Sequence, residues 1–373
     1  MTSKEKAREV LHQAGITING PAPTDPQIKN ERVFDRMFSE GSIGIGESYM
    51  DGWWEVKDLD GFFTKILRAR LDRSIMNIGA LWYVLRARLT NMQTQSRAWE
   101  VGEEHYDIGN DLYERMLDKR MVYTCGYWSS PTTPARDLDD AQEQKLDLVC
   151  RKIGLKAGQT ILDVGCGWGS FAKFAAEKYK AHVVGITISK EQAALARERC
   201  KGLPVEIRVE DYRDTTGQFD HIVSLGMFEH VGPKNYRVYM QKMRELLKDD
   251  GIFLLHTIGA ERTVYTTDPW LHKYIFPNGV LPSVAQIGSA INRQFILEDW
   301  HNFGPDYDKT LNAWWSNFDR AWPELQGTYS ERFYRMWKYY LLTCAATFRA
   351  RRSQLWQLVL TKRGLADGYT PVR

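Results

Sequence analysis

From residue 141 onward, hydrophobic positions alternate between two periods. Short apolar runs bounded by glycine or polar residues predict buried strands at 160–164, 182–186, 205–209, 219–225 and 252–258. Helical spacing of apolar positions predicts helices at 141–155, from the glycine-rich turn to 179, and at 190–200. Such alternation is typical of an α/β fold, a parallel sheet with helices on both faces. Two late strands, 295–300 and 355–362, are expected to form an antiparallel hairpin at the sheet edge.

The first 90 residues follow a different pattern. Residues 1–60 predict short helices separated by glycine and proline, with a turn-rich stretch at 41–46. Residues 62–89 predict a helix in which apolar and basic positions interleave. The chain is therefore expected to comprise a small, mostly helical N-terminal domain (1–90), a polar linker (91–104) and a larger domain (105–373).

Composition narrows the class of protein. The 373 residues are 43% hydrophobic and 26% charged, as in ordinary globular proteins. No apolar run approaches the roughly 20 residues that span a bilayer, and the charged N-terminus does not resemble a secretory signal. The five cysteines are scattered, without a CxxC pair, so we expect a reducing compartment, the cytoplasm, and no metal site.

Basic residues are concentrated before the expected linker. Between Lys65 and Arg97 there are seven lysines and arginines against a single aspartate, although the net charge of the chain is only +3. A basic amphipathic helix binds anionic phospholipid surfaces, but a solvated face or a dimer interface explains the pattern equally well. The near-balanced total charge disfavours nucleic acid binding.

A glycine-rich loop follows the strand at 160–164. Gly165, Gly167 and Gly169 form a D-x-G-x-G-x-G pattern that begins at Asp163. Dinucleotide-binding loops favour G-x-G-x-x-G and an acidic residue about 20 positions on, whereas here Ser170 takes the last glycine position. The pattern instead resembles the first motif of S-adenosylmethionine methyltransferases. A structural turn is the alternative.

Three further loops follow consecutive strands, and ligands of open α/β sheets bind at the carboxyl ends of strands. These loops carry Thr187 and Gln192, then Asp211 and Tyr212, and then residues 226–232. We expect them to surround the same crevice, where Asp211 would accept a hydrogen bond from an adenine amine.

Six stretches carry a more specific resemblance. They are residues 42–54, 105–111, 123–128 (YTCGYW), 162–169 (LDVGCGWG), 226–236 (GMFEHVGPKNY) and 272–279 (HKYIFPNG). With them the protein resembles the cyclopropane fatty acid synthase family, in particular its bacterial phospholipid enzymes, which are related to the mycolic acid cyclopropane synthases. The resemblance implies a small N-terminal domain for dimerisation and contact with the inner membrane surface. It also implies a Rossmann-like S-adenosylmethionine methyltransferase domain.

The resemblance further implies which residues form the site. A bicarbonate ion would be held by Cys125, Glu229, His256, Ile258 and Tyr307. S-adenosylmethionine would contact Tyr123, Thr124, Gly165, Cys166, Gly167, Gly169, Thr187, Gln192, Asp211 and Tyr212. Thr124, Gly126 and Ser170 depart from the usual motifs, which leaves fine substrate preference open.

The implied chemistry explains these residue types. An alkene is a weak nucleophile, so it must be held against the sulfonium methyl; methyl transfer leaves a carbocation, and loss of one proton closes the ring. The base must lie within hydrogen-bonding reach, and both bound bicarbonate and Glu229 itself remain candidates. The buried-looking Cys344 is a weaker candidate for a nucleophilic role.

Three other functions stay open at this point. A related methyltransferase would methylate a carbon of the lipid acyl group without ring closure. A nucleic acid methyltransferase would use the same cofactor fold, and a lipid-binding protein without catalysis would leave Glu229 and His256 unexplained.

Overall fold

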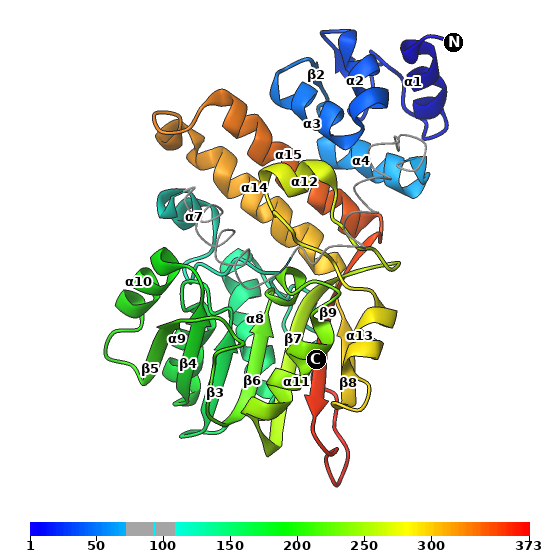
Figure 1. The fold of residues 1–373 in the computed structure, drawn as a ribbon. Coiled ribbons are helices and arrows are strands. Elements are labelled where there is room, and N and C mark those ends of the chain that lie inside the picture. Colours follow the sequence, from blue (N-terminus) through cyan, green and yellow to red (C-terminus); the bar gives the residue numbers. More distant parts are fainter. Residues whose placement is uncertain (72–92, 94–108) are drawn as a thin grey trace. The chain divides into compact units, whose positions relative to one another are not determined.

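The computed structural model describes residues 1–71, 93 and 109–373. These residues form two compact units that interleave along the sequence (Figure 1). The first unit draws on 1–90, 266–277 and 307–353, and the second on 91–265, 278–306 and 354–373. Packing units need not coincide with functional domains, so the functional boundaries at 90 and 105 stay a prediction.

A mixed sheet of seven strands lies in the described part of the second unit. The strands are, in spatial order, β5 (Val205–Val209), β4 (His182–Thr187), β3 (Thr160–Val164), β6 (Phe219–Leu225), β7 (Leu247–Ala260), β9 (Ser353–Thr361) and β8 (Ile296–Asn302). Strands β3 to β7 pair in parallel, which confirms the expected α/β sheet. Strands β8 and β9 pair antiparallel at the edge, as expected. The expected hairpin between them is wrong, because long helices occupy the intervening residues.

Helices cover both faces of this sheet. The helices in the described part of the second unit are α7 (Asn110–Met116), α8 (Leu138–Lys152), α9 (Ser170–Tyr179), α10 (Lys190–Arg199), α11 (Tyr236–Leu246) and α13 (Val284–Ile291). One core cluster joins Leu146 of α8 and Phe171 of α9 to the strands. The other joins Met240 of α11 and Ile287 of α13 to the opposite strand residues. The expectation of helices on both faces is confirmed.

The first unit is built mainly from helices. They are α1 (Ser3–His12), α2 (Arg32–Glu40), α3 (Ser42–Met50), α4 (Leu59–Arg68), α12 (Pro269–Tyr274) and α15 (Glu331–Arg349), with most of α14 (Pro305–Leu325) and the short strands β1 (Gln27–Ile28) and β2 (Trp54–Glu55). The continuous helix expected at 62–89 is wrong, because α4 ends at Arg68 and Arg70 has a positive φ of 58°. Residues 72–89 lie outside the described residues, as do most of the basic segment and of the expected linker. No helix in the described ranges is long and apolar enough to span a membrane.

The turn expected at 41–46 is wrong, because these residues begin helix α3. A side chain at Gly44 would place its Cβ 2.2 Å from the Arg36 carbonyl oxygen of α2. A side chain at Gly46 would place its Cβ 2.4 Å from the Trp270 ring of α12. The glycines therefore permit close packing of helices, and their lack of a side chain was misread as a turn signal.

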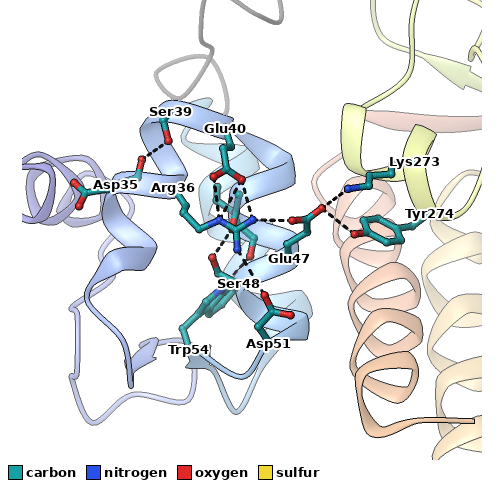
Figure 2. Close-up of polar contacts among 12 residues, drawn as sticks. Asp35, Arg36, Ser39, Glu40, Glu47, Ser48, Asp51, Trp54, Lys273 and Tyr274 are labelled. Carbon is teal, nitrogen blue, oxygen red and sulfur yellow. Dashed lines mark hydrogen bonds and ion pairs between the residues drawn. The ribbon is translucent and has the colours of Figure 1, made fainter.

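Ion pairs join the helices of this unit (Figure 2). Glu47 of α3 accepts hydrogen bonds from Arg36 (2.7 Å), Lys273 (2.6 Å) and Tyr274 (2.8 Å). Burial acts to raise the pKa of Glu47, but these three donors outweigh it and lower the pKa to about 2. The 266–277 segment is thereby tied to the N-terminal helices through one carboxylate.

Candidate active site

The glycine-rich loop lies where the sequence places it, between β3 and α9. Gly165, Gly167 and Gly169 all have positive φ (82°, 53° and 73°), a conformation that favours glycine. The backbone N–H groups of Gly165 and Cys166 both donate to the Ile186 carbonyl, at 3.0 and 2.9 Å, which fixes the loop against β4. Burial raises the pKa of the Cys166 thiol well above its usual value, so this residue offers its backbone rather than a thiolate.

The loops after β4 and β5 carry the next four candidates. The Thr187 hydroxyl donates to Gln192 Oε1 (3.1 Å), and Ser189 caps α10 beside it. Asp211 accepts two hydrogen bonds from Arg213, one backbone (2.9 Å) and one side-chain (2.8 Å). The Tyr212 hydroxyl is buried and has no hydrogen-bond partner among the described residues. Because parallel strands end at one edge of the sheet, these loops share that edge with the glycine-rich loop.

Residues 121–128 approach the same edge. The Tyr123 ring lies 6.5 Å from that of Trp168, which stands within the glycine-rich loop. A side chain at Gly226, after β6, would place its Cβ 2.7 Å from Thr124 Cγ2. The Thr124 hydroxyl accepts a hydrogen bond from Lys145 Nζ (2.7 Å). Cys125 is fully buried, and its thiol donates to the Gly126 carbonyl (3.1 Å).

Glu229 lies in a short 3-10 helix (Phe228–His230) after β6. Its Oε1 accepts the backbone N–H of Ile258 from β7 (2.7 Å), whereas its Oε2 is buried without a partner among the described residues. Burial raises the pKa of Glu229 to about 7, against the opposing hydrogen bond from Ile258. Its carboxyl group can therefore gain or lose a proton near neutral pH.

His256 lies two residues before Ile258 on β7. The amide nitrogen of Gln357 on β9 donates to His256 Nδ1 (3.2 Å), and an amide nitrogen is only a donor. With the Gln357 amide in this orientation, Nδ1 is the acceptor and the ring proton lies on Nε2. Burial lowers the pKa of His256 well below its usual value, so the ring is neutral. In the described part of the protein Nε2 has no partner, and it presents a free N–H.

Sequence reasoning missed two residues at this site, Gln357 and Lys145. No local pattern connects Gln357 to His256, 101 residues away. Lys145 did leave a signal: on α8 it falls at helical spacing between the buried Ala141 and Leu148, where a solvated lysine does not belong.

The two remaining candidates belong to the first unit. Tyr307 on α14 is buried, with its ring 4.6 Å from that of Phe348. Burial raises the pKa of the Cys344 thiol on α15 to about 12, which keeps it protonated at neutral pH. The structure thus brings Cys125, Glu229, His256 and Ile258 into one unit and places Tyr307 and Cys344 in the other.

Comparison with known proteins decides the family. The model of the mycolic acid cyclopropane synthetase family matches residues 93–358, which is well over half of the chain. The chain belongs to this family. The resemblance seen in the six motifs is confirmed, and the sheet described above is the cyclopropane synthetase methyltransferase fold.

Comparison with individual relatives extends the match. The cyclopropane-fatty-acyl-phospholipid synthase of Escherichia coli (strain K12) is 54% identical over 368 residues, covering 98% of this chain and 95% of that protein. A probable fatty acid methyltransferase of Pseudomonas putida is 39% identical over 71% of this chain and 69% of its own. The solved mycolic acid cyclopropane synthase CmaA1, complexed with SAH and CTAB, is 30% identical, with a TM-score of 0.65 over 71% of this chain and 98% of its own.

Proposed function

We propose that this protein is an S-adenosylmethionine-dependent cyclopropane-fatty-acyl-phospholipid synthase. It transfers a methyl group to the cis double bond of unsaturated acyl chains in membrane phospholipids and closes a cyclopropane ring. The observation that carries this conclusion is the 54% identity to the Escherichia coli synthase across 98% of the chain. The site supports it, because a buried carboxyl group and a neutral imidazole lie beside the cofactor edge of the sheet.

S-adenosylmethionine fits the loops at the carboxyl ends of β3 to β6. The unpartnered Tyr212 hydroxyl and the open geometry at Gly167, where an added Cβ would meet nothing within 4 Å, leave room and a polar contact for a ligand. When bound, the cofactor supplies an electrophilic methyl group. We assign its binding to Tyr123, Thr124, the Gly165–Gly169 loop, Thr187, Gln192, Asp211 and Tyr212.

Bicarbonate fits two of the buried polar atoms that lack hydrogen-bond partners in the described ranges. His256 Nε2–H can donate to an oxyanion, and Glu229 Oε2 can accept the hydroxyl proton of the same ion. The Ile258 N–H already donates to Glu229, so its part is to orient that carboxylate. Cys125 completes the proposed set within this unit, and Tyr307 stays an expectation from the family resemblance. When bound, the ion supplies a base that is a poor trap for a carbocation.

The residues then have distinct tasks in ring closure. Methyl transfer forms a carbon–carbon bond as the carbon–sulfur bond breaks, and the acyl chain becomes cationic. One proton then leaves the transferred methyl group, and its bonding electrons close the ring. His256 holds the proton acceptor without competing for the proton, because the imidazole has no free lone pair on Nε2. Glu229, with a pKa of about 7, takes up or passes on that proton.

The experiment is turnover with vesicles of an unsaturated phosphatidylglycerol and labelled S-adenosylmethionine, with and without dissolved bicarbonate. The products are S-adenosylhomocysteine and a lipid heavier by one CH2 unit, with ring protons and no vinylic protons by NMR. Retained vinylic protons would favour methylation at carbon without ring closure, a candidate that the Pseudomonas putida relative supports. Unaltered lipid would refute both.

The substrate implies where the enzyme acts. We propose that the protein is a cytoplasmic homodimer that associates peripherally with the inner membrane surface, and that its basic segment contacts anionic headgroups. Binding to vesicles should then weaken as salt rises, since exposed charge pairs are screened over about 10 Å at 0.1 M. Sedimentation of the purified enzyme tests the dimer.

A further inference from the structure

A fully buried lysine lies beneath the cofactor edge of the sheet. Lys145 of α8 is 0% exposed, and its Nζ donates to Thr124 Oγ1 at 2.7 Å. Burying an ammonium group is costly unless it is paired and hydrogen-bonded. No carboxylate of the described residues lies within ion-pair distance of Lys145 in the structure, so charge pairing alone does not explain its presence.

The surroundings of Lys145 come from four elements. Asp118 follows α7, Cys125 lies in the 121–128 segment, Asp163 is the penultimate residue of β3, and His256 on β7 interacts electrostatically with Lys145. Burial lowers the pKa of Lys145 to about 8, against the opposing effect of Asp118, Cys125 and Asp163. The lysine is therefore charged at neutral pH and loses its charge in mildly alkaline solution.

Thr124 is held in one orientation. Its backbone carbonyl accepts from Gln142 Nε2 (2.7 Å), and its methyl group is directed toward Gly226. Because Lys145 donates to the hydroxyl oxygen, the hydroxyl hydrogen must be directed elsewhere. The Thr124 hydroxyl can therefore donate its hydrogen to an acceptor on a bound ligand.

We propose that Lys145 is a positioning residue that orients the Thr124 hydroxyl toward the carboxylate of bound S-adenosylmethionine. The inference rests on the proposed function, which places this cofactor beside Thr124. The carboxylate is the anionic group of the cofactor, and a buried ammonium one hydrogen bond away favours an anion over the cationic amine or sulfonium. Lys145 thus acts through Thr124 and not by touching the cofactor.

The test measures binding of S-adenosylhomocysteine by calorimetry, so it does not depend on turnover. Lys145→Met keeps the length of the side chain and removes its charge, and Thr124→Val removes the hydroxyl. Each should raise Kd at least tenfold. Because the two residues act through one hydrogen bond, the Kd of the double variant should be no higher than that of the single variant with the higher Kd. If the two contacts were independent, the two fold-increases in Kd would multiply. Thr124→Ser, which keeps the hydroxyl, should bind like the wild type.

Lys152 provides the matched control. It lies seven residues further on α8, is also 0% exposed, and contacts His301 (3.1 Å) and Asp299 (3.7 Å) instead of Thr124. Lys152→Met should disturb folding as Lys145→Met does, yet leave Kd within about twofold of wild type, less than the tenfold that corresponds to about 1.4 kcal/mol. Equal losses of affinity in both variants would overturn the proposal, because they would report a general effect of disrupting the core.

The pH dependence supplies a second readout that needs no lysine variant to fold. Wild-type Kd should rise above about pH 8, as Lys145 loses its charge. Thr124→Val should show only the titration of the ligand itself. An identical pH profile in both proteins overturns the proposal. If the wild type binds no S-adenosylhomocysteine at all, the proposed function fails instead, so the two failures are distinguishable.

Discussion

Glu229→Gln is the substitution that probes the site most directly. Glutamine keeps the volume of the side chain, and its carbonyl oxygen can still accept the Ile258 N–H at the present 2.7 Å. What is lost is the charge and the acceptor at Oε2. A hydrogen bond to a charged group contributes about 1.5 to 3 kcal/mol, which corresponds to a fall in rate of about 10-fold to about 150-fold.

The same substitution should make the protein more stable. The pKa of Glu229 rises from 4.5 in the unfolded chain to about 7 in the folded protein, because the carboxyl group is buried. A folded state that binds the proton more tightly loses stability as pH rises from about 4.5 to about 7. At about 1.4 kcal/mol per pKa unit, the loss above neutrality is about 3 kcal/mol. Glutamine cannot ionise, so it escapes this loss.

Two assays check this reasoning. The first follows transfer of the labelled methyl group into phospholipid vesicles, alongside calorimetric binding of S-adenosylhomocysteine, which should be nearly unchanged. The second compares denaturant unfolding of both proteins at pH 5 and pH 8, where the stability gain should appear mainly at pH 8. Near-normal turnover by Glu229→Gln would refute the assigned role. So would a difference in the free energy of unfolding that is the same at pH 5 and pH 8.

Three further predictions address other parts of the molecule. Gln357→Leu removes the donor that holds His256 in one tautomer, so kcat should fall about tenfold with unchanged cofactor Kd, and a change confined to Kd would contradict this. Cys344→Ala should keep most of the activity, since the pKa of the thiol is raised to about 12 by burial; loss of turnover in a well-folded variant would restore a chemical role for the thiol. Glu47→Gln should lower the free energy of unfolding by about 1 kcal/mol at pH 7, more than Glu40→Gln, whose side chain is 40% exposed. The pKa of Glu47 is lowered to about 2, so this difference should disappear as pH falls from about 4.5 toward 2.

Local patterns predicted the sheet well. Strands β3, β5 and β6 have the predicted bounds and β4 is one residue longer, because short apolar runs bounded by glycine or polar residues leave few alternatives. Strand β7 begins at Leu247, five residues before the predicted start. The glycine-rich loop was equally readable, since three positive φ angles in five residues require glycine. Motifs that identify a family then located Glu229 and His256, which no periodicity would have singled out.

Features that depend on packing between residues far apart in the chain could not be predicted from the sequence. The glycines of α3 permit both a turn and close helix packing, and only the presence of Arg36 and Trp270 decides between them. Lys145 looked like one more charged helix residue, yet it is fully buried. The antiparallel pairing of β8 with β9 was predicted, but the expected hairpin between them was wrong, because α14 and α15 intervene.

The order of the elements has a consequence for biosynthesis. Strand β9 follows α15 directly, so the polypeptide must pass through the last helix of the first unit before it supplies the strand that carries Gln357. Until that strand pairs with β7, His256 lacks the Gln357 hydrogen bond that determines which ring nitrogen carries the proton. A polypeptide that ends before residue 353 lacks both Gln357 and the β9 residues that pack in the core of the sheet. Ring closure therefore requires a strand that is among the last parts of the polypeptide to be synthesised.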